Sequence, residues 1–351
     1  EIRPRDWSSD VCSSDLTGTS ALQHFLQEQR DSLAVQGVCY PRTGSAPGRN
    51  PSHVIIARAL HHDNKGGRLA LLLLRRRFEE EIRPHSRVIC SSEGLQNILS
   101  AERLNFFFRR GPGDPLLDLA GRVFRGGRNR PRYHVRTLCY LREFLDYARS
   151  AYAQRVQASG LFCGFDAFCQ GFSGFDFERF LGFWRGFSDA TEFLSYERTL
   201  EKPGGIVGDF LERLGLRLPV EASGTGDKNP TISGNLLAFK LAVNRHFPHS
   251  EEYYLVLRRL AGAEARFRGP FRIPQDTAAM LRERHRDYNA TLRRTVGDFP
   301  ERDFSQCREV FDARRWPEDV ERILGEPEME PLRRHAEAIR DAARDLPGIG
   351  F

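Results

Sequence analysis

The chain has 351 residues, of which 40% are hydrophobic and 28% charged, a composition that fits one large globular domain or one domain with a helical appendage. No stretch is long and apolar enough to cross a membrane, since even the most apolar run, Leu69–Leu74, is flanked by basic residues. The net charge is +6 and only four of the 53 basic residues are lysines, which favours a solvated arginine-rich exterior or an electropositive cleft for an anionic ligand. No nucleic-acid-binding module accompanies this charge, so no nucleic-acid partner is expected.

The N-terminus reads as translated sequencing adapter. Residues 6–16 are DWSSDVCSSDL, the translation of a common adapter, and Glu1 and Ile2 agree with the adapter bases upstream. We therefore set residues 1–15 apart from the native chain. They carry two basic and four acidic residues, so the remainder has a net charge of +8. We expect residues 1–10 to be disordered or loosely placed, because the polar segment SSDVCSSD is poorly suited to a buried strand.

The elements predicted along the rest of the chain alternate between helices and strands. Thr17–Arg30 opens with hydroxyl residues and continues as an amphipathic helix, which Gly37–Pro41 ends. Further helices are predicted over residues 50–61, 68–81, 144–157, 207–214, 235–245, 250–260, 278–294 and 317–345. Short apolar runs predict strands over Arg87–Cys90, His134–Leu141 and Ala190–Tyr196. This alternation predicts an α/β fold, with an open parallel sheet covered by helices on both faces.

Two further compositional features leave alternatives open. Nine phenylalanines lie between Gly160 and Phe187 inclusive, where they supply core or line a ligand pocket. The seven cysteines form no CxxC pair and no Cys/His metal spacing, so no metal is expected, and scattered thiols suit a reducing cytoplasm.

The first candidate site is a phosphate-binding loop at the start of the predicted first helix. Its residues are Thr17, Gly18, Thr19, Ser20 and Ala21, followed by Leu22-Gln23. Amide N–H groups at a helix N-terminus face an anion, glycine permits close approach, and the hydroxyls add hydrogen bonds. Threonine and serine also serve as ordinary helix caps, so this motif alone is weak.

A second candidate site lies further along the chain. Arg142 follows a predicted strand and Ser150 comes eight residues later in the next helix. With the TGTS loop and the G-x-x-Y-P element of Gly37–Pro41, this pattern resembles the bacterial P-loop sulfotransferases. Tyr196-Glu197-Arg198 and Asn229–Ser233 agree with that family in order and spacing, and the resemblance covers roughly Thr17 to Phe304.

The resemblance implies a P-loop NTPase-like open parallel sheet with extra C-terminal helices. It divides the chain into the adapter (1–15), a sulfotransferase domain (16–312) and a C-terminal helical extension (313–351). It also implies the donor 3′-phosphoadenosine 5′-phosphosulfate (PAPS), with Arg142 and Ser150 on the 3′-phosphate and Thr17–Ala21 on the 5′-phosphosulfate. The P-loop lysine of the family would stand at position 16, where this chain has leucine.

The expected reaction transfers a sulfuryl group from PAPS, leaving PAP, to a hydroxyl or amine of a carbohydrate, lipid or small molecule, without a metal. Glu93, in a Ser-Ser-Glu turn after a predicted strand, is the first candidate for the base that takes the acceptor proton, and His53 is the second. Both residue types also occur in purely structural roles. The alternatives are a P-loop nucleotide kinase or NTPase, and a non-enzymatic protein that binds anionic ligands. As written, with Leu16, the enzyme is expected to be nearly inactive, and its expected location is the cytoplasm.

Overall fold

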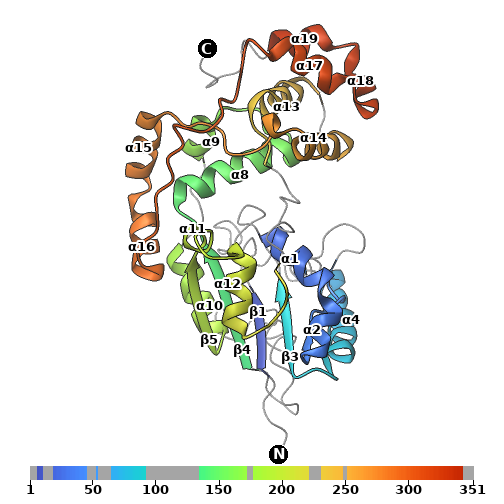
Figure 1. Ribbon diagram of the computed structural model, residues 1–351, viewed down its shortest axis with the longest axis vertical. Helices are drawn as coiled ribbons and strands as arrows, with labels where there is room; N and C mark the ends of the chain where they lie inside the picture. Colours follow the sequence, from blue (N-terminus) through green and yellow to red (C-terminus); the bar gives the residue numbers. More distant parts are fainter. Residues whose placement is uncertain are drawn as a thin grey trace, which may run out of the picture. The chain divides into compact units, whose positions relative to one another are not determined.

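The computed structural model describes most of the chain, which divides into two compact units (Figure 1). The described residues are 6–10, 19–45, 53, 65–91, 134–171, 177–220, 231–247 and 251–342. The first unit, here the sheet unit, comprises Glu1–Arg142, Gly174–Thr225 and Ala290–Phe299. The second, the helical unit, comprises Glu143–Ser173, Gly226–Asn289 and Pro300–Phe351. The predicted mixed α/β class is confirmed.

The sheet unit is built on one five-stranded sheet. Its strands are β1 (Asp6–Asp10), β2 (Val38–Cys39), β3 (Arg87–Ser91), β4 (His134–Leu141) and β5 (Ala190–Ser195). Their order across the sheet is β2-β3-β1-β4-β5, and every neighbouring pair is parallel. The three strands predicted from apolar runs therefore share one sheet, with β1 between β3 and β4.

The central strand is a departure from the sequence-based expectation. Residues 1–10 were expected to be loosely placed, whereas Asp6–Asp10 pair with β3 on one side and β4 on the other. Trp7 lies opposite both Val88 and Val135. Strand pairing is made by backbone groups, and the slot between β3 and β4 offers donors and acceptors on both sides. A polar, proline-free segment can fill such a slot, because tertiary context outweighs strand propensity.

Helices cover both faces of this sheet. They are α1 (Thr19–Glu28), α2 (Arg30–Val35), α4 (Lys65–Ile82), α10 (Phe177–Phe187), α11 (Tyr196–Thr199) and α12 (Gly205–Leu214). Leu138 and Tyr140 of β4 share a buried cluster with apolar side chains of α1, α2 and α12. The alternate residue Thr137 points to the opposite face, where its hydroxyl bonds Ser188 just after α10. Alternate residues of β4 thus face helices on opposite sides of the sheet.

The helical unit is centred on α13 (Gly234–His246), of which residues 234–244 are all buried. Around it lie α8 (Phe144–Ser159), α9 (Phe165–Gly171), α14 (Glu251–Ala263), η1 (Ala265–Phe267), α15 (Gln275–Arg284), α17 (Trp316–Leu324), η2 (Pro327–Met329), α18 (Glu330–Arg333) and α19 (Ala336–Ala342). α16 (Arg286–Val296) begins in this unit and ends in the sheet unit. Asn235 of α13 donates to Asp319 of α17 at 2.8 Å, so the helices after residue 313 pack in the same unit as α13.

Two long predicted helices are interrupted. The one predicted over 278–294 is split at His285, whose ring stacks on Phe144 with centroids 3.7 Å apart. The one predicted over 317–345 is divided into α17, α18 and α19, with prolines at the starts of η2 and α18. Within the described ranges, none of the helices has both the length and the apolarity needed to cross a bilayer.

Candidate functional site at the carboxyl edge of the sheet

The carboxyl ends of the strands gather chemically distinct side chains at one edge of the sheet unit. β1 is followed by residues 11–18 and then α1; Ser91 ends β3; Arg142 follows β4; Tyr196 follows β5. The chain leaves β1 toward the β2 edge and, after β3, passes to β4 on the other side of β1. Ligands of open parallel sheets bind outside the carboxyl ends where the strand order reverses.

Arg142 is held against the end of the neighbouring strand. Because Leu141 pairs with Ser195, the next residues, Arg142 and Tyr196, lie beside each other. The guanidinium carbon of Arg142 lies 4.0 Å from the centroid of the Tyr196 ring. Both side chains are buried, at 6% and 8% exposure. A guanidinium stacked on an aromatic face is held in a fixed orientation.

The backbone that carries Tyr196 is fixed by local hydrogen bonds. The Ser195 hydroxyl accepts from the backbone N–H of Arg198 at 3.3 Å, which caps α11, and donates to the Glu197 carboxylate at 2.9 Å. The Thr199 hydroxyl donates to the carbonyl of Tyr196 at 2.7 Å. The ring is therefore a preorganised platform for Arg142.

On the other side of β1, helix α1 is tied to β3. Gln23 donates from Nε2 to the Ser91 hydroxyl at 3.2 Å, and both side chains are buried. Leu22 and Leu26 are fully buried, as expected for the apolar face of an amphipathic helix. Thr19, Ser20 and Ala21 form the first turn of α1, whose N–H groups have no acceptor within the helix. Thr17 and Gly18, the rest of the predicted loop, lie outside the described residues.

His53 is buried at 1% exposure between the ends of β2 and β3. Its Nε2 lies 3.0 Å from the Pro41 carbonyl oxygen and its Nδ1 lies 3.1 Å from the backbone nitrogen of Ser91. Burial lowers the pKa of the imidazole to about 4. Nδ1 also lies 3.1 Å from the Ser91 carbonyl oxygen, so backbone groups engage both ring nitrogens and the ring is better placed to hold the backbone than to act as a base. Glu93, the other candidate base, lies outside the described residues.

The two residues predicted to share the 3′-phosphate belong to different units. Arg142 ends the first segment of the sheet unit, whereas Ser150 lies in α8 of the helical unit. The Ser150 side chain is buried within that unit.

Sequence reasoning missed the partner of Arg142 and a buried carboxylate nearby. The signal for Tyr196 was its place one residue after a strand, but only strand register reveals which strand end it faces. Asp209 of α12 accepts from the Tyr140 hydroxyl at 2.9 Å and from Arg213 Nε at 2.8 Å. Burial alone would raise the pKa of Asp209, but hydrogen bonds from Arg213, Lys202 and Tyr140 lower it. This carboxylate joins α12 to β4.

No three His, Cys, Asp or Glu side chains within the described part of the chain are grouped so as to hold a metal ion. Comparison of the chain with protein-family models, with curated proteins and with solved structures finds no match. The fold and the site together define an α/β protein with a parallel sheet and a stacked, buried arginine at the carboxyl edge of that sheet.

Proposed function

We propose that the protein is a sulfotransferase that uses PAPS to sulfate a hydroxyl or amine of an acceptor. The observation that carries the proposal is the Arg142 guanidinium, held on Tyr196 at the carboxyl end of β4. The strand order β2-β3-β1-β4-β5 supports it, because the resemblance implies a P-loop-like open sheet with the first strand in the middle. Thr19 and Ser20, the last two residues of the TGTS motif, open α1 after that first strand, as the same resemblance implies.

The residues of this chain suit the 3′-phosphate of PAPS better than its 5′-phosphosulfate. Arg142 offers a planar fork for the 3′-phosphate, and its burial strengthens a charge-assisted hydrogen bond. Thr17–Ala21 would hold the 5′-phosphosulfate through the positive end of α1. At position 16, where a lysine would stabilise charge on the transferring group, the chain carries Leu16. When bound, PAPS supplies the sulfuryl group; the chain's own residues orient it and receive the acceptor proton.

Glu93 is the proposed base, and Ser150 the second proposed ligand of the 3′-phosphate. The sequence puts Glu93 two residues after Ser91, whose backbone is bound by His53. Assignment of the base to Glu93 leaves His53 free to hold that backbone. The acceptor class remains a carbohydrate, a lipid or a small molecule, and the proposed location is the cytoplasm.

Nucleotide kinases and NTPases of the P-loop class also have a phosphate loop between a central strand and a helix. They are therefore the main alternative to a sulfotransferase. Retention on immobilised 3′,5′-ADP separates the possibilities. A sulfotransferase is released by PAP but not by ATP, because the 3′-phosphate carries the recognition. Release by ATP alone favours the kinase or NTPase, and release by any polyanion favours a general anion-binding protein.

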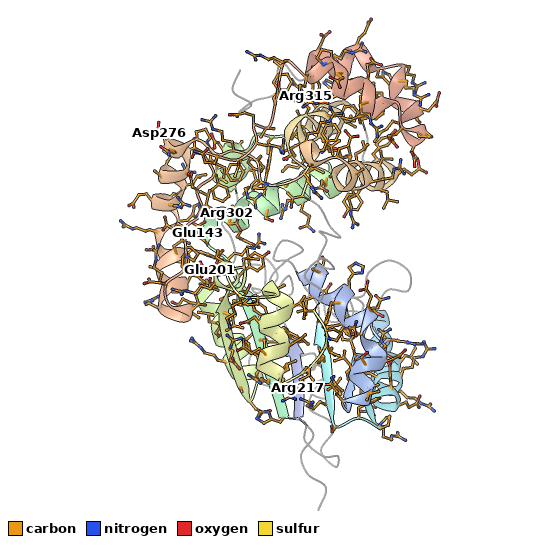
Figure 2. All side chains as sticks on the ribbon, in the orientation of Figure 1. Glu143, Glu201, Arg217, Asp276, Arg302 and Arg315 are labelled. Atoms are coloured by element: carbon orange, nitrogen blue, oxygen red, sulfur yellow. The ribbon has the colours of Figure 1, made fainter. Side chains whose placement is uncertain are left out.

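The role of Arg142 gives the first prediction. Arg142→Ala should weaken PAP binding about 10- to 100-fold in calorimetry, as expected for the loss of a charged hydrogen-bond partner worth about 1.5–3 kcal/mol. Arg217→Ala is the matched control, because it removes the same charge at the amino edge of the sheet. There the Arg217 backbone exchanges hydrogen bonds with Gln36, just before β2. Figure 2 shows Arg217 at the opposite end of the sheet unit from Glu201. Equal PAP affinity in wild type and Arg142→Ala removes Arg142 from the site.

A further inference from the structure

The segment that follows β2 is bound by side chains from three separate parts of the chain. Arg30 of α2 donates to the Tyr40 carbonyl at 2.8 Å, His53 donates to the Pro41 carbonyl, and the Glu81 carboxylate of α4 accepts from the N–H groups of Arg42 (2.6 Å) and Thr43 (2.9 Å). Four consecutive residues are thus fixed through their backbone. Of the three side chains, only His53 also reaches the next strand.

His53 meets Ser91 through both its main chain and its ring. The His53 N–H donates to the Ser91 carbonyl at 2.8 Å, and Nδ1 lies 3.1 Å from both the nitrogen and the carbonyl oxygen of Ser91. Gln23 of α1 binds the hydroxyl of the same serine. Ser91 is consequently held at its N–H, its carbonyl and its side chain, at the point where β3 ends.

These contacts define the tautomer of the ring. Nε2 faces the Pro41 carbonyl oxygen, which only accepts, so Nε2 carries the proton in a neutral ring; Nδ1 faces both the N–H and the carbonyl oxygen of Ser91. In a neutral ring Nδ1 is then an acceptor, and the N–H of Ser91 is the donor that meets it. The Tyr40 ring packs edge-on against the imidazole at 5.0 Å and keeps water from it. The charged groups nearby, Glu81 of α4 and Arg30 of α2, have opposite effects on protonation.

We infer that His53 is a positioning residue: a neutral, Nε2-protonated imidazole that joins the carboxyl end of β2 to that of β3 and fixes the backbone at Ser91. Its consequence for catalysis rests on the proposed function, because Glu93 follows Ser91 by two residues. The link that His53 makes between the ends of β2 and β3 does not depend on the proposed function. Protonation of Nδ1 would replace the bond from the Ser91 N–H by one to the Ser91 carbonyl oxygen, which lies at the same 3.1 Å.

The direct test is nitrogen-15 NMR of the full chain with labelled histidine. The His53 signals, identified by their loss in His53→Gln, should report a neutral ring with the proton on Nε2 from pH 8 down to pH 5. A ring protonated on Nδ1, or one that titrates between pH 6 and 7, overturns the inference. This measurement is made on the unsubstituted chain, so it stands even if a variant fails to fold.

Two variants separate the two ring bonds, because an asparagine amide reaches the place of Nδ1 and a glutamine amide that of Nε2. His53→Asn should keep the Ser91 amide protected from hydrogen exchange within about threefold of wild type. His53→Gln should raise its exchange at least 10-fold. His134→Gln, at an exposed histidine of β4, is the control and should change nothing. Equal protection in the Asn and Gln variants contradicts a role for Nδ1. Retention on the 3′,5′-ADP resin is measured in parallel: its absence in wild type defeats the proposed function, whereas the NMR result decides the role of His53.

Discussion

A buried lysine is the least expected single residue of the molecule. Lys240, one of four lysines in the chain, lies in the middle of α13 at 1% exposure. Its ammonium donates to the Asn244 side chain at 2.6 Å, and Asn244 is anchored by donating to the carbonyls of Val156 and Leu161 at 2.7 Å. Within the described residues the ammonium has no carboxylate partner. Burial accordingly lowers the pKa of Lys240 to about 8.

This lysine makes stability depend on pH. Between pH 8 and its ordinary value of 10.5 the unfolded chain holds the proton and the folded chain does not, so the free energy of unfolding rises with pH in that window. Below pH 8 the buried charge costs about 3 kcal/mol at most. Lys240→Met should therefore stabilise the protein by about 1–3 kcal/mol at pH 7, with a smaller gain at pH 9.5, measured by urea unfolding. Arg245→Met, at an exposed position of the same helix, is the control. A gain that is the same at both pH values contradicts this account.

At the same scale, sequence reasoning identified residue types better than their partners. It singled out Arg142 from its place after a strand, and the structure gives that arginine a partner, Tyr196, which follows from the register of β4 with β5. It offered His53 as a base from residue type alone. Both ring nitrogens of His53 are engaged by the backbones of residues far away in the sequence, which no local pattern reveals.

Among the elements, strands with continuous apolar runs were predicted closely. β3, β4 and β5 match the predicted segments to within a residue; β3 and β4 are largely buried, which favours apolar runs, whereas β5 is a half-buried edge strand. β2 has two residues and leaves no periodic signal. β1 is polar, so its position in the sheet depends on its neighbours. The helix break at His285, whose ring stacks on Phe144, has no glycine or proline to mark it.

One glycine in α12 gives a prediction at the level of the element. A Cβ on Gly208 would lie 2.2 Å from the Pro203 carbonyl oxygen, so the start of α12 and the turn before it approach too closely for a side chain. Gly208→Ala should lower the free energy of unfolding by more than about 1 kcal/mol, against the usual helical preference for alanine. Gly182→Ala in α10 meets no atom within 4 Å and should raise it by up to about 1 kcal/mol. Denaturant unfolding of the two variants measures both free energies of unfolding. A Gly208→Ala variant more stable than wild type would contradict the close approach.

For the whole molecule, the N-terminal segment decides whether the proposed enzyme works. Asp6–Asp10 complete the sheet, but Leu16 brings no charge to the transferring group. A chain with an apolar strand at residues 6–10 and lysine at 16 should transfer sulfate from labelled PAPS about 10²–10³-fold faster than the chain as it stands. Leu16→Lys alone separates the effect of the charge from that of the strand. Equal and substantial activity in all three chains would mean that the first residues are native to the enzyme.

The division into two units has a consequence for the order in which the molecule is made. The chain passes between the sheet unit and the helical unit five times, at residues 142, 173, 225, 289 and 299. A ribosome releases the five strands by residue 195, yet the sheet unit still lacks its last segment, Ala290–Phe299. During synthesis the sheet unit therefore remains incomplete, with part of its surface uncovered, until about a hundred further residues have been made. Neither unit can be obtained by cutting the chain once, and a nascent chain stalled before residue 290 should be the form most in need of a chaperone.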